Sequence, residues 1–169
     1  MLEFMEILKM KDNIFLMIKA SLGDLAGEKI IDITYFPSMN DERNDGIVLL
    51  FSNDYSLKVS AFWRILYQND MIAVYSDRYL LPTHEAPEKD FEKLPYEESL
   101  LYNNIEKINK NYLVGEIRSI DVNDVLDLSI QLKNSLWIQA FICYRNKLGL
   151  NYELYKSKQK IWGVENEEN

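Results

Sequence analysis

The chain contains an imperfect copy of itself, and this repeat limits how it can fold more than any other feature. Three segments recur in the same order along the sequence. The aligned pairs are Leu25–Glu28 with Leu113–Glu116, Ile31–Ile33 with Ile120–Val122, and Ser56–Phe62 with Ser135–Phe141. Chance can supply one such match, because strands resemble one another, but three matches in one order favour an internal duplication.

Each half begins with a helical pattern and continues with strand-like segments. Apolar residues recur at helical spacing over Leu2–Leu22, with Asp12 and Asn13 as a point where the helix could break, and again over Tyr96–Asn111. Alternating apolar and polar residues then predict strands at Lys29–Phe36, Gly46–Phe51, Tyr55–Trp63, Met71–Tyr75, Leu126–Leu132, Leu136–Cys143 and Leu148–Leu154. The connections are too short for parallel crossovers, so we expect antiparallel meanders.

The sequence therefore predicts an α+β fold made of two helix-plus-antiparallel-meander units related by internal duplication. The first unit would span residues 1–80 and the second residues 96–163. A linker at 81–95, rich in proline and acidic residues, would join them, and 164–169 would form an acidic tail. Each unit of roughly 80 residues has a small core, so we expect their shared interface to supply part of the burial.

The charge balance favours a basic protein as a partner. The chain has 19 Lys and Arg against 27 Asp and Glu, a formal net charge of -8. This charge argues against nucleic acid or an anionic membrane as the partner. Acidic segments lie near residue 41, in the linker and in the tail, where they are either solvated or form a face that steers a basic partner. The candidate contacts are Asp41, Glu42, Asp45, Glu88, Asp90 and Glu92.

The sequence carries no recognisable catalytic or metal-binding pattern, so we expect no enzyme activity, no cofactor and no metal. There is no glycine-rich phosphate loop, no serine elbow and no cysteine pair. The single histidine, His84, lies in the linker, where we expect an exposed side chain and not a group that transfers protons. The single cysteine, Cys143, lies in an apolar segment and reads as a buried structural thiol rather than a nucleophile.

No targeting signal is evident at the N-terminus. The segment beginning at Met1 lacks the positive charge of a signal peptide, and the early apolar stretch Ile14–Ile18 is far shorter than the roughly 18 residues that span a membrane. We therefore expect a cytoplasmic protein, with which a reduced Cys143 agrees.

The most distinctive local motif is Trp63-Arg64, which the pattern places at the end of a strand. The guanidinium could stack on a neighbouring ring or pair with a carboxylate such as Asp77, which would make the motif a structural clamp. The other interpretation is a contact with a partner. The second half has Ile142 and Cys143 at the corresponding place, as a duplicated scaffold would if only one half kept a special site.

This motif resembles the signature of a group of small bacterial proteins. The matching residues are Phe51–Asp54, Trp63-Arg64 and Ser76-Asp77. Some members of the group resemble immunity proteins of polymorphic toxin systems, which bind and block a cognate toxin. The resemblance implies a non-enzymatic protein-binding protein that neutralises a toxin domain. The alternatives are a small-molecule-binding or regulatory domain with a pocket between the halves and, third, a hydrolase that uses paired carboxylates.

Overall fold

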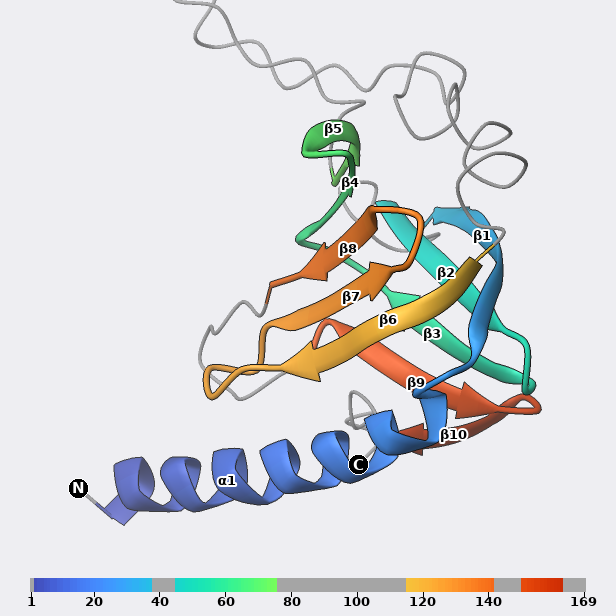
Figure 1. Cartoon of the computed structure of the whole chain (residues 1–169). Coiled ribbons are helices and arrows are strands. Elements are labelled where there is room, and N and C mark those ends of the chain that lie inside the picture. Colours follow the sequence, from blue (N-terminus) through green and yellow to red (C-terminus); the bar gives the residue numbers. More distant parts are fainter. Residues whose placement is uncertain (1, 38–44, 76–114, 142–149, 163–169) are drawn as a thin grey trace, which may run out of the picture.

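The computed structural model describes residues 2–37, 45–75, 115–141 and 150–162. Within them it contains the helix α1 (Leu2–Leu22), the short 3-10 helix η1 (Gly23–Leu25) and ten strands (Figure 1). The strands of the first half are β1 (Lys29–Pro37), β2 (Asp45–Phe51), β3 (Tyr55–Val59), β4 (Trp63–Tyr67) and β5 (Asp70–Val74). The strands of the second half are β6 (Gly115–Val122), β7 (Leu128–Leu132), β8 (Leu136–Ala140), β9 (Tyr152–Lys156) and β10 (Gln159–Trp162).

The ten strands form one sheet whose order reads the same from either end. The order is β10-β9-β3-β2-β1-β6-β7-β8-β4-β5. If each strand is exchanged for its counterpart in the other half (β1 for β6, β2 for β7 and so on), the same order results, read from the opposite end of the sheet. In each half the first three strands form a meander and the last two form a hairpin. Each hairpin pairs with the meander of the other half, because β9 pairs with β3 and β4 pairs with β8. Figure 1 shows the sheet folded over, with β6 crossing in front of β3.

The two halves also match at their irregular positions. Ile31 in β1 and Arg118 in β6 are each the extra residue of a β-bulge. The turns after β2 and β7 contain Asn53 and Asn134, and each Oδ1 accepts the backbone N–H two residues further on, at 3.4 and 3.1 Å. The turns after β4 and β9 both have two central residues with positive φ: Gln68 and Asn69, and Ser157 and Lys158. These shared irregularities define which residues correspond.

This correspondence differs from the alignment of repeated letters. The bulges match Ile31 with Arg118, and the turns match Ser56 with Trp137. The sequence alignment instead pairs Ile31 with Ile120 and Ser56 with Ser135, each two positions from the structural partner. Because side chains alternate between the two sides of a strand, a shift of two residues preserves the alternation and cannot be detected from it.

The predicted fold class, α+β with two helix-plus-antiparallel-meander units, is wrong. The described chain is mostly a single ten-stranded antiparallel sheet with one long helix. The physical reason is the exchange of hairpins, which continues the sheet from one half into the other. In a half folded by itself, the hairpin would have no meander of the other half to pair with, and an isolated hairpin is only marginally stable in water. The predicted second helix, Tyr96–Asn111, lies outside the described residues.

The helix α1 lies where its apolar periodicity predicts it, and it continues through Asp12 and Asn13 without a break. Its C-terminal part joins the core through Ile18 and Leu22, which are 0% and 3% exposed, and Ile14 and Phe15 pack against that core. Figure 1 shows its N-terminal end extending past the sheet. Since Leu16 is 64% exposed, part of the apolar surface of α1 faces solvent.

The predicted strand Tyr55–Trp63 divides into two strands at a corner. The backbone of Phe62 has a φ of 54°, a conformation that bulky residues rarely adopt, so the chain turns there. Trp63 consequently begins β4 instead of ending a strand, and its side chain is 1% exposed. The corresponding residue at the start of β9 is Tyr152, which is also fully buried. The two rings therefore occupy matching places in one core.

We predict that Trp63→Ala lowers the free energy of unfolding by about 3–5 kcal/mol, because it removes a fully buried ring and leaves a cavity. The matched control is Phe62→Ala, which truncates an adjacent ring that is 41% exposed and should cost about 1 kcal/mol. Urea unfolding of both variants measures the difference. Equal losses would contradict the burial of Trp63.

Candidate functional site

One face of the sheet presents two rows of outward side chains across β6, β7, β8, β4 and β5. None of them is buried, whereas the residues between them, such as Ile130 and Ile138, belong to the core. We call this surface the Trp137 face. The first row is Ser119, Gln131, Trp137, Leu66 and Met71, and the second row is Asp121, Ser129, Gln139, Arg64 and Val74.

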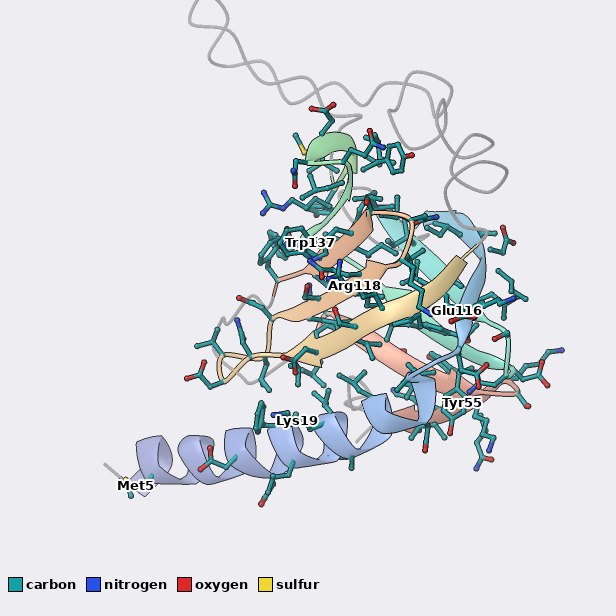
Figure 2. The ribbon with its side chains drawn as sticks, in the orientation of Figure 1. Met5, Lys19, Tyr55, Glu116, Arg118 and Trp137 are labelled. Carbon is teal, nitrogen blue, oxygen red and sulfur yellow. The ribbon has the colours of Figure 1, made fainter. Side chains whose placement is uncertain are left out.

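The two largest polar side chains of the Trp137 face are held by neighbours on adjacent strands. The indole Nε1 of Trp137 donates a hydrogen bond to the hydroxyl of Ser129, so the ring is fixed on β8 (Figure 2). The Nε of Arg64 donates to the side-chain oxygen of Gln139, and its guanidinium lies 5.4 Å from the centre of the Phe141 ring. Both side chains are thus oriented before any partner arrives, which lowers the entropic cost of binding.

Three aromatic residues form a rim at the corner beside Arg64. The ring centres of Phe62 and Tyr75 are 5.2 Å apart, and the Phe62 ring is 41% exposed. The third residue, Phe141, donates its backbone N–H to the carbonyl of Phe62 at 2.8 Å. The aromatic rim therefore extends the apolar part of the Trp137 face around the start of β4.

The corresponding face of the other half provides an internal comparison, and we call it the Tyr155 face. Its members are Asp32, Leu50, Ser56, Tyr155, Lys160, Thr34, Val48, Lys58 and Glu153. Four of these nine residues are charged, whereas the ten residues of the Trp137 face include one arginine and one aspartate. Ser56 takes the place of Trp137, Lys58 that of Gln139, and Lys160 that of Met71. The Tyr155 face thus resembles an ordinary solvated surface.

The composition of the Trp137 face is typical of a protein interface. Interface centres are depleted in charged residues, above all lysine and glutamate, and enriched in aromatic residues, methionine and arginine. The Trp137 face has neither lysine nor glutamate, and it combines Trp137 and Arg64 with Met71. Because the same scaffold carries charges at the matching places of the Tyr155 face, sheet geometry does not impose this composition.

A groove with a volume of about 450 Å³ lies between the C-terminal end of α1 and β6. The helix side contributes Lys19, Leu22 and the turn that follows, and the strand side contributes Ile117–Asp121. Both halves of the sequence therefore line it. Figure 2 shows that Lys19 comes from α1 and Arg118 from β6. The groove adjoins the Trp137 face, since Ser119 and Asp121 belong to both.

In the part of the chain that the structure describes, no group of three or more His, Cys, Asp or Glu side chains could hold a metal ion. In the described residues no helix is long and apolar enough to cross a membrane. The only histidine, His84, and the only cysteine, Cys143, lie outside these residues.

The predicted site residues have different outcomes. Arg64 lies on the Trp137 face, but its neighbour Trp63 is in the core, because adjacent residues of a strand point to opposite sides. Only the backbone of Asp45 is described, in β2. The remaining candidates fall outside the described residues: Asp41, Glu42, Glu88, Asp90 and Glu92.

The sequence interpretation missed Trp137 as a surface residue. A signal was present, because Trp137 alternates with Leu136 and Ile138 and must therefore lie on the other side of the strand. Both sides of that segment are apolar enough to suggest that both are covered. Only the strand register shows that Ser129 and Gln139 lie beside Trp137 on a partly exposed face.

On the Tyr155 face, the hydroxyl of Tyr155 donates a hydrogen bond to the carboxylate of Glu153. This bond, together with partial burial of the phenol, raises the pKa of Tyr155 to about 12. In the unfolded chain a tyrosine ionises near pH 10. Between these values the unfolded state releases a proton that the folded state retains, so the stabilising contribution is complete below about pH 10 and is lost as the pH approaches 12.

We predict that the free energy of unfolding falls less between pH 9 and pH 11 in Tyr155→Phe than in the wild type, because the variant has no phenol to ionise. Urea unfolding of wild type and variant at pH 9 and pH 11 gives the difference, and absorbance at 295 nm follows ionisation. As a control, Glu153→Gln should move the pKa of Tyr155 down towards 10, since the carboxylate acceptor is gone. An unchanged pH dependence in Tyr155→Phe would contradict the assignment.

Comparisons with known proteins add no assignment to this geometry. No protein-family model, no curated protein and no solved structure matches the chain. The resemblance of Phe51–Asp54 and Trp63-Arg64 to a group of small bacterial proteins therefore stays a prediction.

Proposed function

We propose that this chain is a non-enzymatic protein-binding protein whose partner docks on the Trp137 face. The contrast between the two corresponding faces carries the proposal. The scaffold repeats its strands, bulges and turns, yet it has charged side chains on the Tyr155 face and an almost uncharged surface with Trp137 and Arg64 on the other. Such a difference in an otherwise matched pair supports a specific role for one face.

The residues of the Trp137 face suit the energetics of protein recognition. Tryptophan, tyrosine and arginine dominate the binding energy of most interfaces, and a truncated hot spot typically costs about 2 kcal/mol or more. Trp137 and Arg64 are oriented by Ser129 and Gln139, so little rotamer freedom remains to be lost on binding. In the aromatic rim, the exposed Phe62 ring and the half-buried Tyr75 and Phe141 enlarge the apolar contact.

More specifically, we propose that the chain is an immunity protein that binds and blocks a toxin domain in the cytoplasm. The resemblance around Trp63-Arg64 and the formal net charge of -8 support this form. The charge would steer a basic toxin towards the chain over long range, and the Trp137 face would provide the close contact. Such a protein neutralises its target by covering it and needs no catalytic group.

We predict that Trp137→Ser, which installs the residue found at the matching place of the Tyr155 face, weakens binding to a toxin domain encoded by a neighbouring gene about 30-fold. Tyr155→Ala is the matched control, because it truncates an aromatic side chain on the other face and should change the affinity less than twofold. Titration calorimetry of the purified proteins measures both affinities, and circular dichroism verifies that each variant is folded.

Two results would overturn different parts of this proposal. If the neighbouring toxin domain forms no complex with the wild-type chain at low salt, the immunity assignment fails. If a complex forms but neither Trp137→Ser nor Arg64→Ala weakens it, the Trp137 face is not where the partner docks.

A further inference from the structure

The groove beside β6 exists because β1 stops pairing early. β1 and β6 pair only through Lys29 with Glu116 and Ile30 with Gly115. Gly27 has a φ of 81°, a conformation that favours glycine, and the chain before it turns away into η1 and α1. Beyond Ile117 the strand β6 consequently has α1 beside it on that side. A helix and a strand edge leave a space that two paired strands would close.

The floor of the groove is apolar and its margins are cationic. Leu22 and Ile117 line the groove as part of the core, and the more exposed Ala26 and Ile120 add the apolar surface that a ligand can reach. Lys19 and Arg118, both exposed, line the same groove from the helix and from the strand. The bulge in β6 contributes Arg118, and the residue at the corresponding bulge in β1 is the apolar Ile31.

Neither cation is neutralised within the described residues. The ion pair between Lys133 and Glu116 involves neither of them. The Lys19 ammonium lies 5.2 Å from the centre of the Phe15 ring, a contact that leaves its charge uncompensated. The one carboxylate that lines the groove, that of Asp121, accepts the backbone N–H of Val122 at 2.9 Å. Two cations against one carboxylate are notable in a chain with a formal net charge of -8.

We infer that this groove binds a small organic anion, a carboxylate with an apolar body. The carboxylate would lie between the Lys19 ammonium and the Arg118 guanidinium. The apolar body would lie against Ala26 and Ile120, above the buried Leu22 and Ile117. The volume of about 450 Å³ lies within the range of small-molecule sites, about 300–1,000 Å³. This inference goes beyond the protein-binding function and stands on different residues.

The charge and shape of the groove decide against other small ligands. A cation would meet Lys19 and Arg118, and an inorganic anion would leave the apolar floor uncovered. A neutral apolar molecule would cover the apolar floor of the groove but would leave the two cations without a partner. Only an anion with an apolar portion uses both features.

The test uses octanoate as the probe and the full-length chain. Titration calorimetry should show saturable binding, with octanamide at least tenfold weaker because it lacks the charge, and with acetate too weak to detect because it lacks the apolar body. Lys19→Met and Arg118→Gln should each weaken octanoate binding about tenfold, the loss of one charge-assisted contact. Lys58→Met removes a cation from the Tyr155 face and serves as the matched control, with affinity unchanged within twofold.

The outcomes separate this site from the protein-binding face. Trp137→Ser should leave the octanoate affinity unchanged, whatever its effect on a protein partner. The inference is overturned if octanoate shows no saturable binding below about 1 mM, if octanamide binds equally well, or if both groove variants bind like wild type. Unfolding midpoints of Lys19→Met and Arg118→Gln, which alter exposed side chains, verify that any loss reflects the groove.

Discussion

The side-chain amide of Asn151 joins the two places where the chain crosses between the halves, and the fold depends on that junction. Its Nδ2 donates to the carbonyls of Ala61 and Phe141, both at 2.6 Å. The backbone carbonyl of Asn151 accepts the N–H of Ser60 at 2.8 Å. These bonds satisfy backbone groups at the corner between β3 and β4 and at the end of β8. Without them, these partly buried carbonyls would lose their partners, and the cost of leaving a carbonyl unpaired rises with its burial to about 1–3 kcal/mol.

The exchange of hairpins at this corner gives the chain two versions of one surface. The core needs both versions, because it takes large side chains such as Trp63 and Tyr152 from each hairpin. The outward residues are free of that demand, so they can differ without loss of the fold. One face carries Lys58 and Glu153, whereas the other carries Gln139 and Arg64 at the same places. Duplication of this kind stabilises the protein with one set of residues and leaves the other set available for recognition.

The sequence predicted local structure well and long-range pairing poorly. Helical spacing located α1, and alternation located most strands, because both patterns depend on neighbouring residues. The exchange of hairpins depends on contacts between residues far apart, such as Leu57 with Leu154, for which alternation carries no information. For the same reason Arg64 could be singled out by its own chemistry, but Trp137 could not be recognised before Ser129 was known to lie beside it. The groove depends on where β1 stops pairing, which no local pattern shows.

The pairing of β3 with β9 also affects how the protein is made. During synthesis β3 leaves the ribosome almost one hundred residues before β9, so one edge of the first meander waits for its partner. An unpaired edge is a template for any complementary strand, including β9 of another copy. Two chains that exchange these hairpins would satisfy the same hydrogen bonds as one chain, and only the local concentration of each chain's own β9 opposes that exchange. Of the pairings between the halves, the one that completes the sheet is therefore also the one whose second strand is synthesised last.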